Sequence, residues 1–325
     1  MNTVKRIQRV YDSSPEIEFD ESGKFVIMSD VHRGDATWAD NFSDNQNIYF
    51  QALWNYYMDG YTYIELGDGD ELWKNKSIDE IKGMHSHIFW LLSKFYQDKR
   101  LYMLYGNHDM VKKDDRYVKK NLRYYLDESR CCLSPLFPGL AVSEGLLLKY
   151  KRLPYKILLL HGHQGDTIND SLWQIGRFLV RYIWRPLELF GINDPTRAAK
   201  NYNKQLEADD KLIRWAQKSK GMVVAGHTHR PVFPNPGQPL YFNDGSCVHP
   251  RCITALEICK GEISLVKWFV DTKSDGVLFI NRERLAGPAA LEDLFDPEVS
   301  ETRCNYPSLF QVPLCGDEEF LKNRQ

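Results

Sequence analysis

Five short segments of the chain carry side chains that bind metal ions, and short apolar runs end where these segments begin. The segments are Asp30-Val31-His32, Gly67-Asp68, Gly106-Asn107-His108-Asp109, His161-Gly162-His163 and Gly226-His227-Thr228-His229. Carboxylate, amide and imidazole ligands suit first-row divalent cations, and one carboxylate can bridge two of them. The pattern therefore predicts a dinuclear metal centre of the kind that activates water for hydrolysis.

The residue types and spacings predict which residues could bind one metal ion and which could bridge two. Asp30 and His32 flank one residue, so on an extended segment both side chains point the same way. Asp68 follows a glycine that permits a sharp turn, and its two oxygens can reach two cations. A lone Asp-x-His is more typical of a surface turn, but five such segments in one chain predict a metal site. The remaining candidate ligands are Asn107, His161, His227 and His229.

The elements that must position these residues can be read from the apolar pattern. Short apolar runs predict strands at 24–29, 61–66, 101–105, 156–160 and 222–225, and helical periodicity marks 47–58 and 78–98. Alternating strands and helices predict an α/β sheet, largely parallel, with ligands beyond the strand carboxyl ends. Past residue 230, the runs 240–243, 253–259 and 262–270 predict an antiparallel meander. We expect one domain over 1–270, with a helical cap insertion at about 167–218, and a C-terminal tail over 271–325.

Composition argues against several classes of protein. The 325 residues are 43% hydrophobic, enough for a full core, and a net charge of -2 gives no general basic surface for nucleic acid. The seven cysteines include no C-x-x-C pair, which favours free thiols in a reducing compartment. The sequence has no signal-peptide core near residue 1 and no run of about 18 apolar residues. We therefore expect a cytoplasmic protein.

The five segments resemble the signature of the calcineurin-like metallophosphoesterases, D-x-H, G-D, G-N-H-D/E, H and G-H-x-H, over roughly residues 25–267. The resemblance implies a calcineurin-like four-layer αββα sandwich in place of a single sheet. It implies that His108 lies near the substrate phosphate as a proton donor or charge stabiliser, oriented by Asp109. It assigns one metal to Asp30, His32, Asp68 and His229, and the other to Asp68, Asn107, His161 and His227.

The same resemblance implies an enzyme that hydrolyses a phosphate ester or pyrophosphate with a metal-bridged hydroxide and no protein nucleophile. Mn²⁺ is the expected metal because the ligands mix oxygen and nitrogen without thiolate; iron and zinc are alternatives. A protein phosphatase, a nuclease and a non-catalytic scaffold are further alternatives. The net charge disfavours a long nucleic-acid track, so we expect no stable nucleic-acid partner. The complete ligand set disfavours a scaffold.

Several neighbours of the ligands have two interpretations each. His163 could reach the substrate or hydrogen-bond a loop. Asp70 and Glu71 could be partners of the histidines, but a solvated turn is the preferred interpretation. The segment 243–246 resembles a family turn that packs near the metals, and we expect it to be structural.

A basic and aromatic stretch over 171–190 bears on the substrate. Arg177, Arg181 and Arg185 are spaced four apart, so a helix would place them in one stripe beside an apolar face. The helix could pack on the domain, form a lid whose Arg177 and Arg181 bind substrate, or lie in a membrane surface and admit a lipid. The insertion is similar to that of the UDP-2,3-diacylglucosamine hydrolase branch, which implies a lipid-linked nucleotide pyrophosphate as one alternative substrate.

Overall fold

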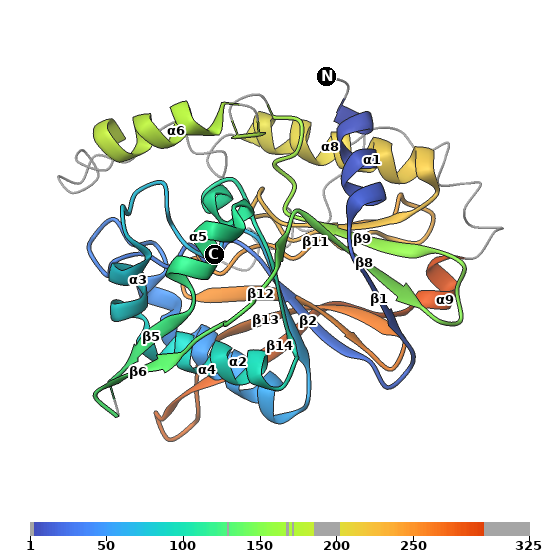
Figure 1. The fold of residues 1–325 in the computed structure, drawn as a ribbon. Helices are drawn as coiled ribbons and strands as arrows, with labels where there is room; N and C mark the ends of the chain where they lie inside the picture. The colour runs from blue at the N-terminus through green and yellow to red at the C-terminus, as the bar shows by residue number, and fades with distance from the viewer. Residues whose placement is uncertain (1–2, 129, 167–168, 171, 185–201, 296–325) are drawn as a thin grey trace.

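The computed structural model describes residues 3–128, 130–166, 169–170, 172–184 and 202–295. Two sheets face each other, and helices cover both outer sides (Figure 1). The seven-stranded sheet has the order β14 (Leu278–Ala290), β13 (Glu262–Thr272), β12 (Cys252–Cys259), β2 (Lys24–Met28), β3 (Thr62–Leu66), β4 (Leu101–Leu104) and β7 (Val142–Ser143). Its β14 to β2 half is antiparallel, and its β2 to β7 half is parallel.

The five-stranded sheet has the order β1 (Glu16–Phe19), β8 (Gly145–Tyr150), β9 (Lys156–Leu160), β10 (Met222–Ala225) and β11 (Tyr241–Asn243). Its pairs are parallel except β8 with β9. A separate hairpin joins β5 (Tyr124–Asp127) to β6 (Cys132–Pro135). The single, largely parallel sheet expected from the strand pattern is therefore wrong, and the two-sheet sandwich is what forms.

Alternation along the strands explains why two sheets stack. In β2, Ile27 packs between the sheets, whereas Val26 and Met28 pack against the helices on the outer side. In β9, Leu159 packs between the sheets and Leu158 packs outward. Because both faces of each central strand are apolar, each strand needs cover on two sides. The result is the four-layer αββα arrangement that the family resemblance implied.

The helices flank these sheets. On the seven-stranded sheet lie α2 (Gln46–Met58), α3 (Ile78–Met84) and α4 (Ser86–Gln97), and on the five-stranded sheet lie α1 (Thr3–Ser13) and α8 (Tyr202–Ser219). Shorter elements are η1 (Ser43–Asn45), η2 (Met110–Lys113), α5 (Asp115–Asn121), α6 (Trp173–Leu179), the π-helical η4 (Val180–Trp184) and α9 (Leu291–Leu294). The helix expected over 78–98 is two helices, because His85 leaves helical geometry and bonds the Asp40 carboxylate at 3.1 Å.

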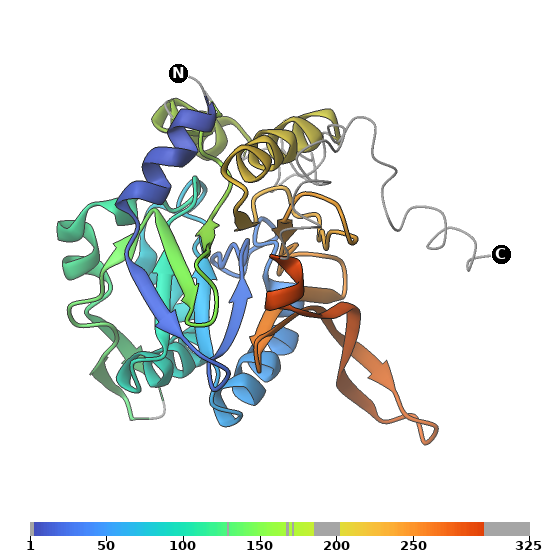
Figure 2. The ribbon, with the colours of Figure 1, turned by 90° about the vertical axis from the view of Figure 1, so that its right-hand side faces the viewer.

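Two expectations for the C-terminal third are wrong. β11 is not part of the antiparallel meander, since it pairs in parallel with β10 in the other sheet. The tail expected to begin at residue 271 instead continues the sheet: β13 runs to Thr272, turns at Asp275-Gly276 and returns as β14. Figure 2 shows this hairpin, in orange, projecting from the body of the molecule. Residues 296–325 lie outside the described part of the chain.

The insertion between β9 and β10 contains α6, η4 and α8 in its described part, so helical periodicity there is correctly predicted. Arg185 and the segment 185–201 lie outside the described residues. In Figure 1, α6 lies along the upper side of the molecule, beyond the loops that follow the strands. Among the described residues, no helix has both the length and the apolar character needed to cross a bilayer.

Candidate metal centre

The five segments meet at one edge of the sandwich and are tied to one another through their backbones. The amide of Asp30 donates to the Gly67 carbonyl at 3.1 Å, and the amide of His32 donates to the Asp68 carbonyl at 2.9 Å. Within the other sheet, the amide of Gly226 donates to the His161 carbonyl at 3.0 Å, and between the sheets the amide of His227 donates to Asp30 Oδ2 at 2.7 Å. Loops that follow strands of both sheets thus face each other, as the strand-end positions predict.

The backbone at the ligands is left-handed and not extended. φ is +50° at Asp30, +51° at His32, +51° at Asp68, +67° at His227 and +55° at His229. Such values are uncommon for residues other than glycine and gather at functional sites. The expectation that Asp30 and His32 alternate along an extended segment is therefore wrong, and His227 and His229 have the same left-handed backbone. The side chains of each pair are instead directed to the centre by left-handed turns of the backbone at both residues.

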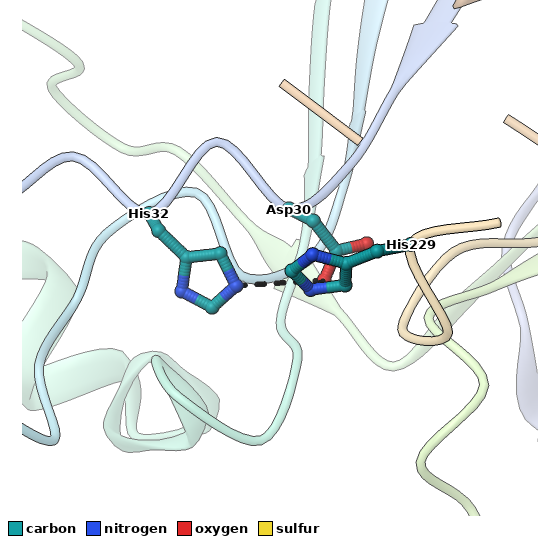
Figure 3. Close-up of side chains that lie close together, drawn as sticks. All are labelled: Asp30, His32 and His229. Atoms are coloured by element: carbon teal, nitrogen blue, oxygen red, sulfur yellow. Dashed lines mark ion pairs between the residues drawn. The ribbon is translucent and has the colours of Figure 1, made fainter. Parts of the chain in front are cut away.

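Six of the candidate ligands form two triads. The ligand atoms of Asp30, His32 and His229 lie within 4.8 Å of one another, and so do those of Asp68, His161 and His227. Figure 3 shows the three side chains of the first triad close together, with dashed lines for the ion pairs among them. Asp30 Oδ1 is 2.9 Å from His229 Nε2 and 3.6 Å from His32 Nε2.

Asp68 lies between the triads. Its Oδ2 is 3.1 Å from His161 Nε2 and 3.8 Å from His32 Nε2, so one oxygen faces an imidazole of each triad. Its other oxygen, Oδ1, accepts a hydrogen bond from the amide of His108 at 2.8 Å, which fixes the carboxylate in this orientation. This is the placement that a bridging carboxylate requires.

In several ligands, the atom that points away from the centre is hydrogen-bonded to the described part of the protein, whereas the atom that faces the centre is not. His161 Nδ1 bonds the Leu66 carbonyl at 3.0 Å, and His32 Nδ1 bonds Glu71 at 3.2 Å. Asp30 Oδ2 accepts from Ser29 and from the amide of His227. Among the described residues, three ligand atoms that are buried without a hydrogen bond are Asn107 Oδ1, His32 Nε2 and His161 Nε2. Buried polar atoms are rarely left so, and two divalent cations fit the donors.

Electrostatics also favour cations at this edge. Burial lowers the pKa of His32, but Asp30 and Glu71 raise it to about 10. Burial likewise lowers the pKa of His161, yet Asp68 and Asp30 raise it to about 9. Without metal, the carboxylates therefore favour the protonated forms of His32 and His161, whereas burial and His161 lower the pKa of His227 to about 4. Divalent cations would satisfy the same attraction.

Two glycines permit the close approach of these loops. A Cβ at Gly106 would lie 2.1 Å from Asp68 Oδ1, and a Cβ at Gly226 would lie 2.1 Å from Ser29 Oγ. Any side chain at either position would push the ligand loops apart. The glycines that precede Asn107 and His227 are thus required by packing at the centre.

Comparison with known proteins identifies the family. The family model described as calcineurin-like phosphoesterase matches residues 23–231. The chain belongs to the calcineurin-like phosphoesterase family. A search of curated proteins found no match. Similar solved structures include Vps29 of Chaetomium thermophilum, at 10% identity and a TM-score of 0.35, covering 81% of this chain and 97% of that one.

A second similar structure is a putative 5'-nucleotidase from Staphylococcus aureus in complex with alpha-ketoglutarate. It is 13% identical with a TM-score of 0.34, and the match covers 86% of this chain and 57% of that one.

In this calcineurin-like phosphoesterase, Glu71 orients His108. The His108 Nδ1 bonds Glu71 Oε1 at 2.8 Å, and the ring stacks on Trp73 with centroids 4.4 Å apart. Burial raises the pKa of Glu71, but His108 and His32 lower it well below its usual range. The preferred interpretation of Asp70 and Glu71 as a solvated turn is therefore wrong, since both are buried. The alternative, a partner of the histidines, is correct for Glu71.

Asp109 does not orient His108 as expected. Its carboxylate accepts from the amides of Gly106 at 2.7 Å and Gly69 at 3.2 Å, and from Lys112 Nζ at 2.7 Å. Lys112 also lies 2.7 Å from Asp70, which Arg33 contacts at 2.8 Å. Arg33 in turn bonds Glu65 at 2.7 and 2.9 Å. This buried charge network, defined by Arg33, Glu65, Asp70, Asp109 and Lys112, lies beneath the metal loops.

The candidate substrate residues have the following surroundings. His163 is fully buried, its ring centroid is 5.6 Å from that of His161, and burial and His161 lower its pKa. Arg177 lies over the Trp173 ring at 4.8 Å, and Arg181 donates to backbone carbonyls of residues 72–75. The segment 243–246 packs behind the centre as expected, with Ser29 Oγ donating to Asp244 Oδ1 at 2.7 Å.

Replacing Glu71 with glutamine is expected to lower turnover about 10- to 100-fold, the usual cost of removing a carboxylate that orients a metal-site histidine. The glutamine amide has the same shape as the glutamate side chain, but it is neutral and binds the N–H groups of His32 and His108 more weakly than a carboxylate does. Metal-dependent kcat of the purified variant, with metal content measured alongside, tests this. Glutamine at Glu80, which is exposed on α3, is the control. Wild-type kcat in Glu71→Gln would rule out the orienting role.

Proposed function

We propose that the protein is a phosphoric ester hydrolase that cleaves a phosphate ester or pyrophosphate with two divalent metal ions. The single observation that carries the proposal is the pair of ligand triads joined by Asp68, in a chain of this family. Asp30, His32, Asp68 and His229 would hold one ion, and Asp68, Asn107, His161 and His227 the other. Bound metals of this kind acidify water and offset negative charge on phosphoryl oxygens.

The chain's own groups complete the site. The His108 side chain is 22% exposed, whereas the side chains of His32, Asp30 and Asp68 are almost fully buried, so His108 stands at the open side of the centre. Because Nδ1 bonds Glu71, Nε2 is the ring nitrogen of His108 that would remain for a substrate phosphate. There it would stabilise charge or hand a proton to the leaving oxygen. No covalent protein nucleophile is part of the proposal.

We propose Mn²⁺ as the metal, with iron or zinc as alternatives. The donor set of carboxylate and amide oxygens with imidazole nitrogens, and no thiolate, supports a borderline or hard cation. Elemental analysis of protein purified without added metal, followed by reconstitution of the chelated protein with each ion, tests the assignment. The cation that restores turnover at the lowest concentration identifies it.

Hydrolysis of a small panel tests the function. The panel holds p-nitrophenyl phosphate, bis-p-nitrophenyl phosphate and a UDP-sugar lipid pyrophosphate, each assayed with Mn²⁺ and with chelator. We expect release from at least one substrate with Mn²⁺ and none with chelator. Equal release under both conditions would refute a metal-dependent hydrolase, and the preferred member separates monoesterase, diesterase and pyrophosphatase.

A lipid-linked nucleotide pyrophosphate is the second candidate substrate, and one surface favours it. α6 and η4 leave large apolar side chains 41–58% exposed in a single short segment, and their opposite side packs beside the centre through Trp173. The exposed members are Ile175, Phe178, Leu179, Tyr182 and Ile183. Lys76 and Lys113 lie against rings of the same segment and add positive charge. An apolar face bordered by basic groups suits an anionic lipid surface.

We therefore expect the protein to bind phosphatidylcholine vesicles that contain phosphatidylglycerol more tightly than vesicles that lack it. Phe178→Glu should weaken this binding about tenfold or more, because one buried aromatic side chain contributes about 2 kcal/mol. Vesicle co-sedimentation measures the effect. Leu133→Glu, at an exposed position on β6, is the matched control and should bind as wild type does. Equal loss in both variants would remove the support for a lipid substrate.

A further inference from the structure

The guanidinium of Arg181 contacts three backbone carbonyls of one turn. Arg181 Nε donates to the Trp73 carbonyl at 3.0 Å, and Nη2 donates to the carbonyls of Leu72 at 2.5 Å and Asn75 at 2.8 Å. Arg181 lies in η4, the π-helical continuation of α6. π-helical turns are rare and often occur at functional sites. One side chain of the insertion thus binds the carbonyl groups of the turn at residues 72–75, which lies outside the insertion.

That turn is the one that holds His108. Residues 72–75 follow Glu71, and the turn is closed by Glu71 itself, whose carbonyl accepts the amide of Asn75 at 3.1 Å. The Glu71 carboxylate also accepts the amide of Lys74 at 3.3 Å. Glu71 bonds the His108 ring, and Trp73 stacks on it. The Arg181 guanidinium is therefore linked to the imidazole of His108 through one residue, Trp73, whose carbonyl it binds and whose ring stacks on His108.

Apolar packing supports the same contact. Trp73, Met110 and Trp173 form a small buried cluster, against which Val180 of η4 packs. This cluster brings α6 and η4 to the turn but does not fix the rotation of the turn, because apolar contacts have no direction. The three hydrogen bonds from a planar guanidinium do have direction, and a lysine at this position could not reproduce their fork.

We propose that Arg181 is a positioning residue that fixes Glu71 and Trp73, and through them His108, so that turnover depends on the docking of η4 onto the metal domain. The inference rests on the proposed function and deepens it. It replaces the expected role of Arg181 in substrate binding, since three of its N–H groups are already directed at carbonyls of the protein.

Kinetics of Arg181→Ala and Arg181→Lys in the metal-loaded enzyme test the proposal. We expect kcat for p-nitrophenyl phosphate to fall about 10- to 100-fold in Arg181→Ala, because small misplacements of catalytic groups cost up to about 100-fold. KM and metal content should stay near wild type, and Arg181→Lys should recover part of kcat. A raised KM with unchanged kcat would overturn the proposal in favour of substrate binding, and wild-type kinetics would overturn it outright.

Arg100→Ala is the matched control. The Arg100 guanidinium also donates to two backbone carbonyls, those of Tyr57 at 3.1 Å and Tyr61 at 2.8 Å, at a turn preceding β3. Its loss removes the same kind of contact far from the metal loops. We expect Arg100→Ala to lower the melting temperature without changing kcat. An equal fall of kcat in both variants would make the effect of Arg181 a general loss of stability and overturn the proposal.

Two further measurements separate this inference from the proposed function. In a His108→Ala background, Arg181→Ala should cause no further fall in kcat, because both changes disable the same group; a full additional fall would overturn the proposal. Amide hydrogen exchange over residues 69–76 should speed up in Arg181→Ala but not in Arg100→Ala, whether or not any substrate is turned over. Unchanged exchange would overturn the inference, whereas absence of hydrolysis by the wild type would count against the proposed function.

Discussion

Replacing Asp68 with alanine is expected to abolish metal-dependent hydrolysis while the fold survives. Asp68 is the carboxylate that faces an imidazole of each triad, so its loss weakens both cation sites together. Metal ions contribute several kcal/mol to stabilising the charge that develops in phosphoryl transfer, which corresponds to a fall in kcat/KM of about 1,000-fold or more. Asn107→Ala, which removes a buried oxygen from the second site, should act in the same direction.

The measurement is kcat/KM with saturating Mn²⁺, together with metal content by elemental analysis and circular dichroism for the fold. Asp59→Ala is the control, because Asp59 is exposed at the end of α2, before β3 and away from the strand carboxyl ends. Full activity of Asp68→Ala or Asn107→Ala would refute a dinuclear mechanism. If circular dichroism shows that Asp68→Ala is unfolded, the same measurement is made on Asp68→Asn, which keeps the side-chain volume.

Replacing Lys112 with methionine is expected to destabilise the protein by about 3–5 kcal/mol, the usual cost of removing one partner from a buried ion pair. Lys112 is buried between Asp70 and Asp109, each 2.7 Å from its Nζ. Burial lowers the pKa of Lys112, but Asp109 and Asp70 raise it above its usual range. Without this cation, and among the residues that the structure describes, Asp70 would keep only Arg33 as a cationic partner and Asp109 would be a buried carboxylate without a cation beside it.

Urea unfolding of the metal-free protein measures this loss as a lower midpoint with an unchanged m-value. Lys149→Met is the matched control, since Lys149 pairs with Glu16 and Glu18 at the surface of β8. The control should unfold at nearly the wild-type midpoint because exposed ion pairs contribute little. Equal midpoints for Lys112→Met and the wild type would mean that the buried charge network does not stabilise the fold.

The position of the metal site could be predicted from the sequence because it follows from strand ends. Each run of apolar residues gave a strand, and each ligand segment begins where its strand stops, as in β9 and His161. The partition of these strands into two sheets needed the family resemblance. Both sheets contain parallel strands with apolar runs, and the pattern of one strand does not say which neighbours it has.

The partners of the ligands could not be predicted in the same way. An acidic pair such as Asp70-Glu71 has the composition of a solvated turn. Its partners lie far away in the sequence: Arg33 and Lys112 pair with buried Asp70, and His32 and His108 pair with buried Glu71. The left-handed backbone at Asp30 or His229 gives no composition signal either, since it is imposed by contacts between loops.

The left-handed backbone at the ligand residues also makes the candidate metal centre a place of local conformational strain. A non-glycine residue in this conformation costs about 1–2 kcal/mol, and Asp30, His32, Asp68, His227 and His229 all adopt it. Glycine at these positions would relieve the local strain, but it would also remove the side chains that could bind the metals. The edge that would hold the cations therefore carries a local cost in stability, and bound cations would offset part of this cost by holding the five loops together.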